Sequence, residues 1–166
     1  MTSAVPVNGR NGPIYTIVRN PLAAIAAGLA LVALAWGQES GTDAAKQLFA
    51  QYVALERAYD PSVADLYAED ALIKIRRKPP MGDPQDVIIP APKYKTQLRE
   101  LAPVAKVRGD RSTYSGVTYT PEGEFVRINA SRVSQPGKHA SPISLLVGRS
   151  PGGQWLIYEE RSESQQ

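Results

Sequence analysis

Three turn signals divide the last third of the sequence into β-rich segments. They lie at residues 120–123, 135–137 and 150–153, and each combines proline with glycine. Turns this short join neighbouring antiparallel strands, so the pattern predicts a four-stranded antiparallel meander. The four strands are expected at about residues 112–119, 124–134, 141–147 and 154–161.

The meander is preceded by a junction, residues 60–75, where a helix gives way to a strand. Asp60 is a good N-cap and Pro61 suits the first helical position, so a short helix is predicted to begin here. Residues 71–75 are rich in β-forming side chains and predict a strand directly after that helix. The residues expected to face the core are Val63, Leu66 and Tyr67.

Helical periodicity appears on both sides of this junction. From Thr42 or Asp43 to Tyr59, apolar residues recur at three- and four-residue steps. A further helix is predicted from Pro92, and Pro103 is expected to end or kink it. These helices are expected to cover one face of a sheet.

The remaining segments contain breaker residues or end the chain. Residues 78–92 hold five prolines, so we predict loops around a short edge strand at residues 87–89. Residues 162–166 are predicted to form a frayed tail.

Residues 1–37 have the composition of an export signal. The first 20 residues carry Arg10 and Arg19 but no acidic residue, and residues 22–36 are an apolar run. Cleavage is predicted before Trp36, or alternatively after Gly37. The run of about 15 residues is shorter than the roughly 20 of a transmembrane helix. An uncleaved membrane anchor is the alternative interpretation.

Both interpretations place the domain, residues 38–166, outside the cytoplasm. The basic residues precede the apolar run and acidic residues follow it, which is the arrangement of the positive-inside rule. We therefore expect a periplasmic or extracellular domain that contacts a membrane only through an uncleaved N-terminal segment.

Composition excludes several kinds of chemistry. The chain has no cysteine and one histidine, His139, which removes disulfides, thiol nucleophiles and His-rich metal sites. Of the 19 basic residues, Arg10 and Arg19 precede residue 38, which leaves 17 basic against 16 acidic residues in the domain. A nearly neutral domain gives little electrostatic reason to expect nucleic-acid binding. We expect no metal, no cofactor and no nucleic-acid partner.

The order of the predicted elements resembles the cone-shaped α+β fold of the nuclear transport factor 2-like superfamily, which includes SnoaL-like polyketide cyclases and ketosteroid isomerases. The resemblance covers residues 42–163 and is most evident at residues 65–71 and 153–157. It implies three N-terminal helices on a bent, mainly antiparallel sheet that ends in the meander and encloses a pocket. Such pockets serve isomerases, dehydratases, epoxide hydrolases, cyclases and non-catalytic binding domains, so the fold alone does not define a function.

The resemblance also argues against one enzymatic mechanism. Ketosteroid isomerases carry a general-base aspartate a few residues after a segment similar to residues 67–71. The matching position here is Ile75, which cannot accept a proton. We therefore assign no catalytic residue, and the chain is interpreted as a binding protein rather than an enzyme.

Strand periodicity locates polar groups that would face the pocket. Val126, Ile128, Ala130 and Arg132 lie on one face of a predicted strand, and Arg132 is the polar member of this row. We interpret Arg132 as a ligand contact. The alternatives are an ion pair with an acid such as Glu159, because an unpaired buried charge is costly, or a charge exposed at the end of the strand.

The last strand offers two rows that are almost equally apolar, and the sequence leaves open which of them faces inward. The rows are Trp155, Ile157 and Glu159, or Leu156, Tyr158 and Glu160. In the first case Glu159 is a further candidate ligand contact. Four tyrosines are candidates for the pocket wall, with a core position as the alternative for each. These are Tyr52, Tyr94, Tyr114 and Tyr119.

Three functions follow as hypotheses. The first is an exported small-molecule-binding domain with an apolar pocket and a small apolar ligand. The second is a non-catalytic assembly module at the cell envelope that forms a homodimer through its open sheet face. The third is an isomerase-like or cyclase-like enzyme. An open apolar cavity with one or two convergent polar groups would favour the first.

Overall fold

A computed structural model describes the backbone of residues 26–135 and 139–165 and the side chains of residues 41–135 and 139–164. The chain divides into two units, of which the second comprises residues 35–166. The predicted leader, residues 1–20, lies outside the described residues, and the predicted cleavage positions fall within helix α1 (Ala26–Ala58). No helix in the described part of the chain has a stretch long and apolar enough to cross a membrane.

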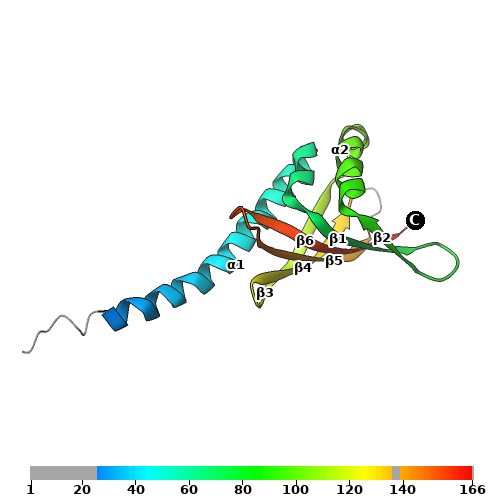
Figure 1. The fold of residues 1–166 in the computed structure, drawn as a ribbon. Helices are drawn as coiled ribbons and strands as arrows, with labels where there is room; N and C mark the ends of the chain where they lie inside the picture. Colours follow the sequence, from blue (N-terminus) through cyan, green and yellow to red (C-terminus); the bar gives the residue numbers. More distant parts are fainter. Residues whose placement is uncertain (1–25, 136–138, 166) are drawn as a thin grey trace, which may run out of the picture. The chain divides into compact units, whose positions relative to one another are not determined.

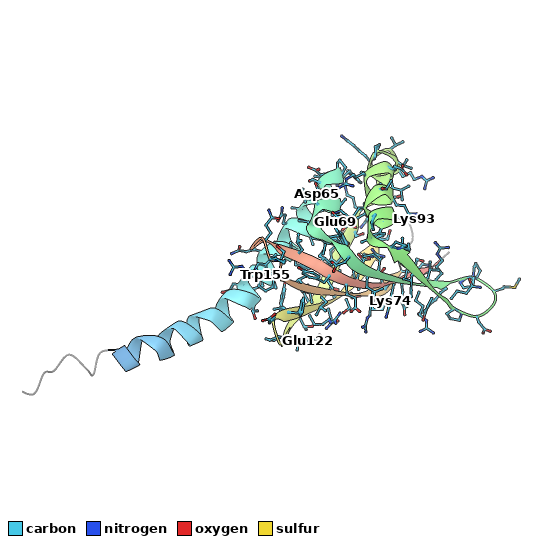
Figure 2. The ribbon with its side chains drawn as sticks, viewed as in Figure 1. Asp65, Glu69, Lys74, Lys93, Glu122 and Trp155 are labelled. Carbon is cyan, nitrogen blue, oxygen red and sulfur yellow. The ribbon has the colours of Figure 1, made fainter. Side chains whose placement is uncertain are left out.

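The second unit is an α+β domain (Figure 1). After α1, its elements in the described residues are η2 (Pro61–Leu66), β1 (Tyr67–Lys78), β2 (Gln85–Pro90), α2 (Ala91–Arg108), β3 (Ser112–Glu122), β4 (Phe125–Ser134), β5 (Ala140–Arg149) and β6 (Trp155–Gln165). Arg99 of α2 forms an ion pair of 2.6 Å with Asp65 of η2, which joins the two helices. Figure 2 shows Asp65 and Lys93 of α2 on the same side of the sheet.

The prediction of three N-terminal helices is not confirmed. The second helix, η2, is a single stretch of 3-10 helix, and α2 follows β1 and β2 rather than preceding the sheet. The predicted start of η2 is confirmed: the Asp60 carboxylate accepts the Ser62 backbone N–H at 2.9 Å, and Pro61 is the first helical residue. Val63, Leu66 and Tyr67 are buried as expected.

The six strands form one mixed sheet in the order β2-β1-β6-β5-β4-β3. Neighbouring strands from β3 to β6 are antiparallel, which confirms the predicted meander, and β2 is the predicted edge strand. The prediction of a frayed tail is wrong, because Ser162 and Ser164 of β6 pair in parallel with Ile75 and Arg77 of β1. This parallel pairing joins the two ends of the domain's sequence in one sheet.

Helix α2 continues through its internal proline. Pro103 lies inside the helix, which extends to Arg108 and ends at Gly109 with φ of 68°. The Gly109 N–H donates to the carbonyls of Ala105 and Lys106, an arrangement that favours glycine because of its left-handed backbone. The helix therefore does not end at Pro103, and the alternative expectation, a kink at this residue, stays a prediction.

A bulge in β6 decides which of its side chains face the helices. The register shifts by one residue at Tyr158, so that Ile157 pairs with Val147 and Glu160 pairs with Leu145. These four paired residues are at most 1% exposed and lie on the face covered by α2 and η2, here called the helix face. Neither predicted row is continuous, because the bulge turns both Ile157 and Glu160 toward the helix face.

The same bulge places Glu159 on the opposite side of the sheet, here called the open face. Glu159 accepts hydrogen bonds from Arg127 at 2.5 Å and from Arg161 at 2.9 Å. Arg127 also forms an ion pair with Glu122 at 3.3 Å. The alternative prediction of an ion pair between Glu159 and Arg132 is wrong, because Arg132 lies on the helix face.

The open-face charges predict an acid-dependent loss of stability. Burial raises the pKa of Glu159, but the hydrogen bonds from Arg127 and Arg161 outweigh it and hold the pKa below its ordinary value of 4.5. A lowered folded-state pKa stabilises the protein above about pH 4.5, and this contribution is lost as the pH falls through the folded pKa. Glu159→Gln should lower the free energy of unfolding by about 1 to 3 kcal/mol at pH 7.

The difference between Glu159→Gln and the unmodified protein should shrink toward zero as the pH falls through the lowered folded-state pKa of Glu159, because the unmodified carboxyl group then also becomes neutral. Denaturant titrations of both proteins at several pH values measure this. A difference that stays constant with pH would contradict the assignment.

Candidate functional site

Strand β4 carries the inward row that the sequence predicts. Val126, Ile128 and Ala130 are buried on the helix face, and Arg132 follows them. Within the described residues, no ion pair includes Arg132, and its Nε is the only buried side-chain nitrogen or oxygen without a hydrogen-bond partner. An unpaired buried donor costs about 1 to 3 kcal/mol, so the Nε of Arg132 is a donor that the described side chains leave unsatisfied.

Arg132 lines a cavity of about 440 Å³ beside α2, here called the α2 cavity. Its walls come from the end of α1, η2, α2, the start of β3 and the end of β4. The apolar wall consists of Val63, Leu98, Leu101, Ala102, Val104 and Ala105. The charged residues that line it are Glu56, Asp60, Arg108, Asp110 and Arg132. The cavity is therefore apolar along α2 and polar where α1 meets β3 and β4.

Glu56 of α1 lines the α2 cavity together with Arg132 and is a residue that sequence reasoning missed. Its Oε1 accepts a hydrogen bond from the Ser112 hydroxyl at 2.9 Å, and its Oε2 accepts one from the Tyr114 hydroxyl at 2.5 Å. Tyr114 is the cross-strand neighbour of Arg132. Helical periodicity places Glu56 on α1 but carries no signal of these partners, which lie 56 and 58 residues away.

The surroundings of Arg132 keep its guanidinium charged. Burial lowers the pKa of Arg132, but the nearby Tyr52 and Tyr114 and the carboxylates of Glu160 and Glu56 raise it, and the net effect is upward from the ordinary value. Arg132 therefore remains a cationic hydrogen-bond donor at any pH at which the protein is folded.

Behind Arg132, the carboxyl group of Glu160 is completely buried on β6. It accepts a hydrogen bond of 2.5 Å from the Tyr67 hydroxyl and bonds of 3.2 Å from the Tyr94 hydroxyl. Burial and the nearby Glu160 raise the pKa of both tyrosines well above the ordinary range, so their hydroxyls stay protonated donors. Glu160 is satisfied by the protein itself, whereas Arg132 is not.

None of the four predicted tyrosines lines the α2 cavity. Tyr52 stacks on Phe49 and contacts Tyr114 edge to face, with ring centroids 6.1 and 6.2 Å apart, and Tyr119 contacts Phe49 at 6.5 Å. Tyr94 packs against Tyr67 at 5.4 Å. The structure therefore brings Arg132 to the cavity, packs the four tyrosines into aromatic contacts away from its lining, and places Glu159 on the opposite face of the sheet.

A second hollow of about 500 Å³ lies on the open face. The charged residues that line it are Lys74, Arg76, Asp86, Arg161 and Glu163. Four of these five already have partners, because Arg76 pairs with Asp86, Arg161 with Glu159, and Glu163 with Lys78. It therefore lacks the unsatisfied buried donor that distinguishes the α2 cavity. In the side chains that the structure describes, no group of three acidic or histidine residues is placed to hold a metal ion.

No protein-family model and no curated protein matches this sequence. Solved structures match the fold. An NTF2-like protein of unknown function from Pseudomonas putida KT2440 is 13% identical, with a TM-score of 0.58, over 76% of this chain and 87% of that one. A candidate dehydratase of the NTF2-like family from Streptomyces avermitilis is 9% identical, with a TM-score of 0.57, over 76% and 96%.

A third solved structure covers more of this chain. It is an NTF2-like protein with a cystatin-like fold from Novosphingobium aromaticivorans, which is 16% identical, with a TM-score of 0.52, over 87% of this chain and 90% of that one. At these identities the similarity concerns the fold and not an activity. The chain has the nuclear transport factor 2-like fold that its sequence resembles.

Proposed function

We propose that this domain binds a small molecule in the α2 cavity and that Arg132 makes the orienting polar contact. The observation that carries the proposal is the buried Nε of Arg132, which has no hydrogen-bond partner in the described residues. A cavity of about 440 Å³ lies within the range of about 300 to 1,000 Å³ that is usual for ligand pockets. Its apolar wall suits the body of an apolar ligand.

The charges of the cavity favour a neutral ligand over an anionic one. Three acidic residues, Glu56, Asp60 and Asp110, and two basic residues, Arg108 and Arg132, line it, which leaves one excess negative charge. An anion that reached Arg132 would also approach Glu56, and like charges at short range repel. A carbonyl or hydroxyl oxygen can accept from Arg132 without this cost, so we propose a neutral, oxygen-bearing ligand.

The backbone at the cavity supports a functional role. Tyr59, which lines the cavity, is the only non-glycine residue with a positive φ in the described residues, at 57°. This left-handed backbone ends α1, and the Asp60 N–H donates to the Leu55 carbonyl across it at 2.9 Å. Strained backbone of this kind is concentrated at binding and catalytic sites, because the surrounding structure must maintain it.

The role of Arg132 can be tested with two fluorescent probes of similar size. Prodan is a neutral naphthyl ketone, and anilinonaphthalene sulfonate is an anion. The unmodified protein should bind prodan more tightly, and Arg132→Met should weaken prodan binding about 10- to 100-fold by removing a charge-assisted hydrogen bond. Fluorescence titration measures both affinities. Equal prodan affinity in the two proteins would contradict the role of Arg132.

Tyr67→Phe is the matched control. Tyr67 bonds to Glu160 and does not line the α2 cavity. Loss of this hydrogen bond should lower the free energy of unfolding by about 1.5 to 3 kcal/mol and leave prodan affinity unchanged. Arg132→Met should weaken prodan binding without lowering the free energy of unfolding, because methionine retains an apolar stem and removes an unpaired donor. If both variants lose stability and binding together, Arg132 has a folding role instead.

A specific observation favours a second candidate function, self-association through the open face. Ile88 is 63% and Leu72 is 37% exposed on strands β2 and β1, and Ile88 lines the open-face hollow. Apolar residues on an exposed sheet face are suited to an interface. Native mass spectrometry separates the two functions: a retained small molecule on a monomer supports binding, and a ligand-free dimer supports the assembly module.

We also infer that the domain acts outside the cytoplasm. The inference depends on the basic leader with Arg10 and Arg19 and the apolar run at residues 22–36. N-terminal sequencing of the envelope protein should give a mature start near Trp36 or Gln38 if the segment is cleaved, and Met1 in a membrane fraction if it is an anchor. A full-length protein in the cytoplasmic fraction would contradict both.

A further inference from the structure

Helix α2 exposes large apolar side chains along its second half. Leu101 is 58%, Val104 41% and Val107 89% exposed, at successive three-residue steps. Neighbours at this spacing form a stripe along a helix surface. Leu101 and Val104 also line the α2 cavity, whereas Val107 does not. No described segment of the domain covers Val107.

Basic residues accompany this stripe. Lys93, Lys106 and Arg108 are exposed on α2 and have no ion-pair partner among the described residues. Lys93 marks the start of the helix in Figure 2. Glu100 is the single acidic residue of α2, and Arg99 is already paired with Asp65. The exposed surface of α2 therefore combines apolar side chains with an excess of two positive charges.

We infer that the exposed surface of α2 docks on a membrane surface that contains anionic lipid. Amphipathic helices with basic residues beside an apolar stripe bind in this way, because the apolar side chains enter the lipid and the cations meet the headgroups. A second protein is a poorer match, since a stable interface needs about 20 to 30 residues on each side and this stripe is one helix wide.

Docking has a consequence for the α2 cavity. Leu101, Val104 and Arg108 belong to both the docking surface and the cavity lining. A docked domain therefore holds the mouth of the cavity at the boundary between lipid and water. If the proposed function is correct, an apolar ligand passes between the lipid and the cavity without crossing bulk water. The docking itself does not depend on the proposed function.

The test uses the full chain with one reporter. The protein contains no cysteine, so Val107→Cys provides a unique site for a nitrobenzoxadiazole label, whose fluorescence rises in an apolar environment. Met81→Cys is the matched control, because Met81 is 91% exposed in the loop between β1 and β2. Each labelled protein is titrated with vesicles of phosphatidylcholine alone and of phosphatidylcholine with phosphatidylglycerol.

We expect fluorescence at position 107 to rise with the anionic vesicles and not with the neutral ones, while the label at position 81 responds to neither. Adding Lys93→Gln, which removes an exposed cation on the same face of α2 as Val104, should weaken the response at position 107 about fivefold, because one cation near an anionic surface contributes that factor. High salt should also weaken the response at position 107, because salt screens the attraction between the cations and the anionic vesicles.

Four results would overturn the inference. They are no rise at position 107, an equal rise at positions 107 and 81, a rise that is the same on neutral vesicles, and a rise without vesicles as the protein concentration increases. The last result would indicate a second copy of the chain as the partner. Since prodan binding is measured without vesicles, failure here is distinguishable from failure of the proposed function.

Discussion

The buried carboxyl group of Glu160 is the interaction on which much of this domain depends. A carboxyl group that is fully excluded from water must be hydrogen-bonded inside the protein. Its donors are Tyr67 on β1 and Tyr94 on α2, so the sheet and the helix must be docked for the group to be satisfied. The bulge at Tyr158 is what directs Glu160 to this position rather than to the open face.

The charged groups of the domain differ in whether the protein itself provides their partners. Glu160 has hydroxyl partners, and Glu159 has Arg127 and Arg161 on the open face. Arg132 lies in the same interior without such a partner in the described residues and lines a cavity with an apolar wall. Its guanidinium is therefore interpreted as part of a binding site and not of the packing.

The sequence predicted the elements whose signals are local. Turn residues defined the meander, Asp60 and Pro61 marked the start of η2, and the row ending at Arg132 followed from strand alternation. The bulge in β6 has no local signal, so sequence alternation could not decide between Glu159 and Glu160. The partners of Glu56 and the parallel pairing of residues 162–165 depend on contacts between distant segments, which one sequence does not reveal.

The most direct test of this account is nuclear magnetic resonance of the arginine side chains with and without prodan. The account predicts that the Nε–H signal of Arg132 moves downfield on saturation, as its donor gains an acceptor, while that of Arg127, which is already paired with Glu122 and Glu159, stays in place. Bound prodan with an unchanged Arg132 signal would contradict the claim that Arg132 orients the ligand.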